Sequence, residues 1–156
     1  MEHFLFKQLA FVRGQTFKAM EGVSEEIADR IPEGFRNSIR WNLGHIYVVL
    51  ERFAFLHANL PLLLPEGFKE RFESGTSPLT SQVSFPAPSL QQLETLLKDQ
   101  QERIREALAP RIHEQISPPY TTSAGMTLGS IDQFLSFNLY HEGMHLNAIK
   151  NYKRLL

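Results

Sequence analysis

The 156-residue sequence contains no cysteine. This absence excludes disulfide bonds, thiolate metal ligands and a cysteine nucleophile. A metal site in this chain must therefore use His, Asp or Glu side chains. Any thiol chemistry must take its thiol from a second molecule.

An excess of one charge and a long apolar run are also missing. Sixteen Lys and Arg residues against seventeen Asp and Glu leave a net charge of -1, which gives no sign of nucleic-acid binding. No window approaches the ~18 consecutive apolar residues of a membrane span, and the start of the chain does not resemble a signal peptide. We expect a cytoplasmic protein with no nucleic-acid or membrane partner, forming one domain over residues 1–156.

Hydrophobic periodicity is the main structural signal. Apolar residues recur at helical spacing in four long segments. They are residues 4–20, residues 38–59, a segment from Ser89 to about residue 110, and a last segment that begins at Thr127 or Ser130 and runs to the C-terminus. Ser89 with Gln92 forms the Ser-x-x-Gln pattern of a helix-starting capping box.

The connections between these segments are rich in proline. Residues 61–88 contain five prolines and one candidate short helix at about residues 68–72, and residues 110–126 are expected to be irregular. No segment shows the alternating pattern of a strand. The sequence therefore predicts an all-α fold, a four-helix bundle with a long crossover loop.

Two histidines in the last helical segment, His141 and His145, are four residues apart. Positions i and i+4 lie on one face of an α-helix, so both imidazoles can reach one metal ion. His45 lies on the flank of the apolar stripe of the second long segment and is the candidate third ligand. Three histidines leave at least one coordination position open, which is typical of reactive metal sites.

Other polar residues near these motifs have two interpretations. Asn42 and Asn138 each precede a candidate ligand by three residues, so they either orient a ligand imidazole or a bound water, or make local hydrogen bonds only. The remaining histidines are predicted to be solvated surface residues; they are His3, His57 and His113.

The segment from His141 to His145 also matches the His-Glu-x-x-His pattern of zinc metalloproteases, in which the glutamate activates water. The eleven residues that follow His145 include no His, Asp or Glu, so the chain cannot supply the downstream third ligand of those proteases. We therefore disfavour a protease and expect Glu142 to face solvent or a neighbouring helix.

Two motifs together resemble a known family. The runs Trp-Asn-Leu-Gly-His-Ile at residues 41–46 and Tyr-His-Glu-Gly-Met-His-Leu at residues 140–146 are similar to those of the DinB-like (YfiT-like) superfamily of bacterial four-helix bundles. The resemblance implies that His45, His141 and His145 bind a divalent metal, commonly zinc or nickel, in a homodimer. Asn147 departs from the family, where glycine often follows His-Leu.

The resemblance also suggests an activity. Characterised relatives include metal-dependent transferases that add bacillithiol, mycothiol or glutathione to electrophiles, beside isomerases and presumed hydrolases. Our leading hypothesis is a thiol S-transferase that joins a low-molecular-weight thiol to a small electrophile at the three-histidine metal site. A metal-dependent hydrolase and a non-enzymatic metal-binding stress-response protein remain alternatives.

Overall fold

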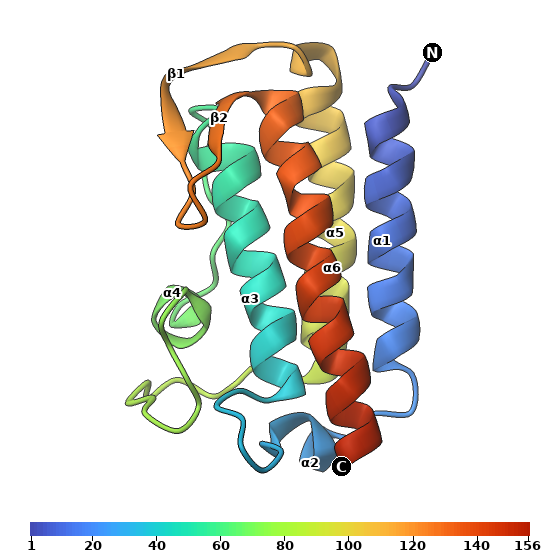
Figure 1. Ribbon diagram of the computed structural model, residues 1–156, viewed down its shortest axis with the longest axis vertical. Helices are drawn as coiled ribbons and strands as arrows, with labels where there is room; N and C mark the ends of the chain where they lie inside the picture. Colours follow the sequence, from blue (N-terminus) through green and yellow to red (C-terminus); the bar gives the residue numbers. More distant parts are fainter.

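The computed structural model describes residues 1–156, and four long helices dominate it (Figure 1). Helix α6 contacts both α1 and α3, and α5 also contacts both α1 and α3, so each long helix lies between two others. The predicted helical character is confirmed. The long helices are α1 (Phe4–Met20), α3 (Ile39–Glu51), α5 (Leu90–Leu108) and α6 (Ile131–Leu155).

Shorter helical elements occupy the connections and the helix ends. A π-helical turn, η1 (Arg52–Leu56), continues α3, and a 3₁₀ turn, η2 (Ala109–Arg111), continues α5. Helix α2 (Glu25–Asp29) precedes α3, and α4 (Phe68–Phe72) lies in the crossover where the sequence predicted a short helix.

Local sequence signals set the helix starts. The Ser89 hydroxyl accepts a hydrogen bond from the Gln92 backbone N–H, and the Gln92 side chain accepts one from the Ser89 N–H. This is the predicted capping box. Ser38 caps α3 with a single hydrogen bond, which its hydroxyl accepts from the Trp41 N–H.

The expectation that residues 110–126 are irregular was wrong. Strand β1 (Gln115–Thr121) pairs antiparallel with β2 (Thr127–Ser130) in a two-stranded hairpin. The register is irregular between Gln115 and Tyr120, the stretch that contains both prolines, and proline cannot donate to a strand ladder. The hairpin buries Leu128 against the helices, and α6 begins directly after it.

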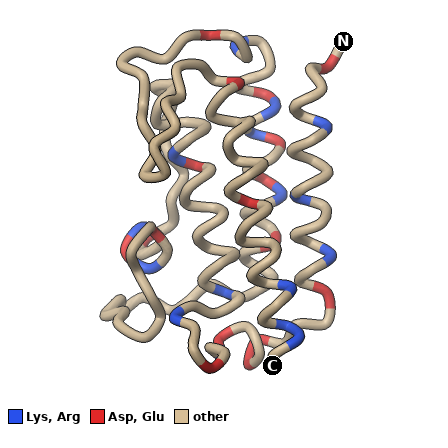
Figure 2. The backbone as a smooth tube through the Cα atoms, in the orientation of Figure 1, with Lys and Arg blue, Asp and Glu red and all other residues tan.

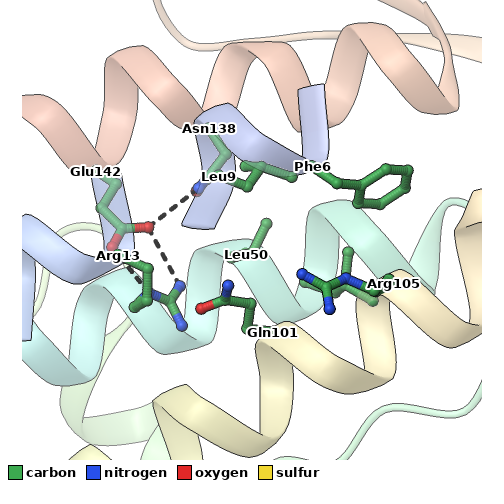
Figure 3. A pocket seen from close by; sticks show the side chains of 9 residues that line it. Phe6, Leu9, Arg13, Leu50, Gln101, Arg105, Asn138 and Glu142 are labelled. Atoms are coloured by element: carbon green, nitrogen blue, oxygen red, sulfur yellow. Dashed lines mark hydrogen bonds and ion pairs between the residues drawn. The ribbon is translucent and has the colours of Figure 1, made fainter. Parts of the chain in front are cut away.

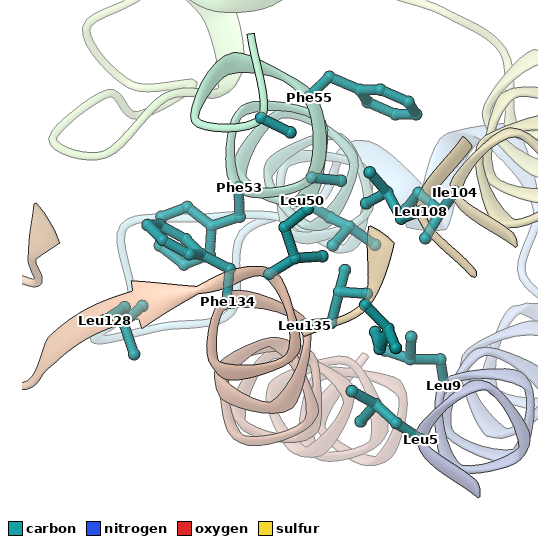
Figure 4. Close-up of a cluster of buried hydrophobic side chains, with 14 of the residues drawn as sticks. Leu5, Leu9, Leu50, Phe53, Phe55, Ile104, Leu108, Leu128, Phe134 and Leu135 are labelled. Atoms are coloured by element: carbon teal, nitrogen blue, oxygen red, sulfur yellow. The ribbon is translucent and has the colours of Figure 1, made fainter. Parts of the chain in front are cut away.

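The apolar core consists of two clusters at opposite ends of the long helices. The first joins the start of α1, the end of α3 with η1, the end of α5 and the start of α6 to the hairpin (Figure 4). The second joins the opposite ends of the same helices to α4. Buried polar residues occupy the region between the clusters, among them Arg13, Asn138, His141 and Glu142.

Helix α3 is buried on all sides, since every residue from Ile39 to Glu51 is buried. The crossover covers the face that the other long helices leave free. The Leu63 carbonyl accepts a hydrogen bond from the Tyr47 hydroxyl at 2.6 Å, and the Leu63 N–H donates to the Glu51 carboxylate at 2.8 Å. The predicted crossover is therefore a packed part of the fold.

Charged residues of both signs are interspersed along the helices (Figure 2). No helix combines the length and the apolarity that a membrane crossing requires.

Candidate metal centre

Three imidazoles converge between α3 and α6. His45 comes from α3, His141 and His145 come from α6, and one ring nitrogen of each lies within 4.8 Å of the others. The Nε2 atoms of His45 and His141 are 3.2 Å apart. Donors at 2.0–2.1 Å from a tetrahedral zinc lie roughly 3.3 Å apart, so this spacing suits a shared metal ion. The structure thus brings together the three histidines that the sequence selected.

Hydrogen bonds fix the tautomers of two of these rings. His45 Nδ1 lies 2.6 Å from the Phe72 carbonyl oxygen, and His145 Nδ1 lies 2.8 Å from Asn42 Oδ1. Both partners are acceptors, so each Nδ1 carries the proton and each Nε2 presents a lone pair. Asn42 donates its own amide N–H to the Ser38 carbonyl, which turns its oxygen toward His145.

Trp41 forms one wall of the centre. Its ring stacks on His45 with centroids 4.6 Å apart and an interplanar angle of 12°. The indole N–H donates to the Thr76 hydroxyl in the crossover at 2.9 Å. Trp41 was not among the sequence candidates, although the motif that carried the family resemblance begins with it.

The surroundings keep the three rings neutral. Burial, together with repulsion from His145 and His45, lowers the pKa of His141 to about 3. Burial and His45 lower the pKa of His145 to about 4. Burial also lowers the pKa of His45, against the opposing effect of its bond to Phe72. Metal binding requires deprotonated imidazole, so the site is in its binding form at neutral pH.

Glu142 faces a neighbouring helix, one of the two places predicted for it. Its carboxylate is almost fully buried and pairs with Arg13 of α1 through contacts of 2.8 and 3.2 Å (Figure 3). The Thr16 hydroxyl donates to it at 2.9 Å. These bonds hold Glu142 as a structural anion, away from the role of a water-activating base.

Arg13 was missed by the sequence analysis. Its guanidinium also donates to the Leu97 carbonyl and to the Gln100 side chain, so α1 and α5 are joined to α6 through one buried group. The signal was the position of Arg13 on the inward stripe of residues 4–20, four residues after Leu9.

The two candidate asparagines have different environments. Asn42 contacts His145, as described above. Asn138 donates its amide N–H to Glu142 Oε2 at 3.2 Å, whereas its Oδ1 is buried with no hydrogen-bond partner.

The other histidines lie outside the cluster. His3 and His113 are exposed, as predicted. The prediction for His57 was wrong, because its ring is half-buried and stacks on Phe134 with centroids 4.6 Å apart. The Tyr120 ring of the hairpin lies on the His57 ring as well, with ring centroids 4.9 Å apart.

Comparison with known proteins agrees with the fold. The sequence profile of the DinB superfamily matches residues 8–149, which confirms the family resemblance found in the two histidine motifs. A crystal structure described as the conserved protein of a locus from Enterococcus faecalis superposes with a TM-score of 0.69, covering 99% of this chain and 97% of that chain at 15% identity. That likeness is one of fold. No curated protein matches the chain significantly.

Proposed function

We propose that this chain, which belongs to the DinB superfamily, holds a divalent metal with His45, His141 and His145 and acts as a thiol S-transferase. Zinc and nickel both suit three imidazole donors. The substrates are a low-molecular-weight thiol and a small electrophile.

One observation carries the proposal, namely the convergence of three neutral imidazoles without a fourth protein ligand. No Asp or Glu oxygen belongs to the cluster, and the chain has no cysteine. The remaining coordination position is therefore left for a molecule from solution, as in catalytic rather than structural sites.

The choice of thiol over water rests on the surroundings of the metal centre. A divalent metal lowers the pKa of a coordinated thiol, so that the thiol reacts as a thiolate at neutral pH. This activation needs no protein base, and the carboxylate of Glu142, the residue after His141, is engaged by Arg13 and Thr16. The chain also offers no internal thiol to compete for the metal.

The direct test is a conjugation assay with a chromogenic aryl halide. The purified protein is stripped of metal, reloaded with zinc or nickel, and supplied with glutathione, bacillithiol or mycothiol. We expect a thioether to form while halide and one proton are released, with a rate that depends on both metal and thiol. Loss of the aryl halide without thiol would instead identify a hydrolase. Full metal occupancy without turnover of any substrate would favour a binding protein.

His141→Ala tests the metal site, and His113→Ala is its matched control. Both remove one imidazole, but His113 is exposed and is not part of the cluster. Thiol-dependent turnover should disappear in His141→Ala and persist in His113→Ala.

A further inference from the structure

Two buried polar atoms without a hydrogen-bond partner lie three residues apart on α6. They are Oδ1 of Asn138 and Nδ1 of His141. Asn138 is completely buried, and His141 is 8% exposed. A buried polar atom without a partner is costly and calls for an explanation. Here the two atoms are complementary, because one is an acceptor and the other is a potential donor.

His141 Nδ1 is the donor when the ring binds metal. The Nε2 atom faces the shared point of the cluster, 3.2 Å from His45 Nε2, so the proton belongs on Nδ1. A metal-ligating histidine almost always donates its second N–H to an oxygen. His45 and His145 do so, to the Phe72 carbonyl and to Asn42. His141 is the one ligand whose orienting acceptor is missing.

The orientation of the Asn138 amide is set by its other neighbour. The ionised Glu142 carboxylate only accepts hydrogen bonds, so the Asn138 NH₂ group must point toward it, as the 3.2 Å contact shows. Glu142 is in turn held by the Arg13 guanidinium (Figure 3). The ion pair therefore directs the Asn138 oxygen away from Glu142.

Asn138 lies three residues before His141 on α6. Residues i and i+3 share a face, and helical side chains lean toward the N-terminus over the preceding turn.

We propose that Asn138 is the positioning residue of His141, with Oδ1 accepting the Nδ1–H of the metal-bound ring. The Arg13–Glu142 pair is then part of the metal site, because it fixes which end of the amide faces the imidazole. This inference rests on the metal binding proposed above.

Two variants test the proposal, with zinc affinity measured by competition against a chelator. Asn138→Leu keeps the size of the side chain and removes the acceptor, and zinc affinity should fall roughly 10–100-fold. Asn147→Leu, at an exposed position of the same helix, should leave the affinity unchanged.

A second readout separates positioning from general structural support. Long-range ¹⁵N NMR of the zinc-loaded wild type should show the His141 Nδ1–H protected from solvent exchange, and Asn138→Leu should lose this protection. If that proton exchanges freely in the wild type, the proposal is wrong even if Asn138→Leu does not fold. Wild-type affinity in Asn138→Leu would also overturn it. Failure of the wild type to bind zinc would instead refute the proposed metal site.

Discussion

Gly44 lies one residue before a candidate ligand and touches the crossover. A methyl group at this position would lie 2.5 Å from the Cγ and Cδ1 atoms of Phe72. The Phe72 ring is 1% exposed and sits in the second core cluster, so it cannot turn away without moving α4. Gly44→Ala therefore pushes α4 from α3, and the Phe72 carbonyl moves away from His45 Nδ1.

The expected magnitude follows from two opposing terms. Inserting a methyl group into a well-packed site costs about 1–3 kcal/mol. Replacing glycine by alanine inside a helix gains about 1 kcal/mol. Gly44→Ala should therefore lower the stability of the metal-free protein by up to about 2 kcal/mol, which is a fall of up to roughly 4–8 °C in Tm for a chain of this size. Loss of the bond that orients His45 should weaken zinc binding by roughly 10–100-fold.

Gly14→Ala provides a matched control. Gly14 lies inside α1, and a methyl group added there meets no atom within 4 Å. This variant should gain about 1 kcal/mol in stability and keep wild-type zinc affinity. Thermal unfolding followed by circular dichroism and chelator competition measure both effects. If Gly44→Ala is stabilised as much as Gly14→Ala and binds zinc normally, Phe72 does not press on α3 and the reasoning fails.

Three further predictions concern the histidines and the buried ion pair. His141→Ala should abolish stoichiometric zinc binding in a folded protein, while His113→Ala keeps it; elemental analysis showing a full complement in the first variant would exclude the triad. The pKa of His141, about 3, is below its unfolded value of ~6.5, so the folded metal-free protein binds fewer protons and should lose stability as pH falls from about 6.5 toward 3. A Tm that stays constant from pH 7 to pH 4 would show that these rings are not buried as neutral groups. Arg13→Leu leaves Glu142 buried without its cation and should cost about 3–5 kcal/mol in urea unfolding, and a cost below about 1 kcal/mol would mean that the pair is solvated.

The helices were predictable because their signals are local. Helix α1 spans Phe4–Met20, the range given by the periodicity, and α5 begins directly after Ser89 of the capping box. The predicted end of the second long helix was less accurate, since α3 changes into a π-helical turn at Arg52. Apolar spacing does not distinguish these two helical forms over a single turn.

The hairpin could not be predicted from local pattern. Its first strand contains Pro118 and Pro119, which interrupt the alternation that marks a strand. The strand exists because Ile116 and Leu128 are buried against the first core cluster, a tertiary contact. The error at His57 has the same origin, because the hairpin residue Tyr120 helps to enclose that ring.

The three candidate ligands could be predicted from the sequence, but the residues that hydrogen-bond to His45 and to Glu142 could not. His141 and His145 share a face by spacing alone, and His45 was the candidate third ligand because of its place on the flank of the apolar stripe of the second long segment; the family resemblance supported all three. The acceptor for His45 is the backbone carbonyl of Phe72, and any residue type supplies such an atom. The partner of Glu142 is Arg13, 129 residues away, and nothing in the single sequence links these two positions.

The crossover sets the surroundings of the candidate metal centre without supplying a ligand. The long helices alone leave one side of α3 uncovered, and α4 with its flanking residues closes that side through Phe72, Thr76 and Leu63. The same closure leaves His45 only 4% exposed, and burial is the main cause that lowers its pKa. Because an imidazole must be neutral and correctly oriented to bind metal, both conditions at His45 depend on the crossover. Substitutions in this segment should therefore change metal affinity even though they remove no ligand.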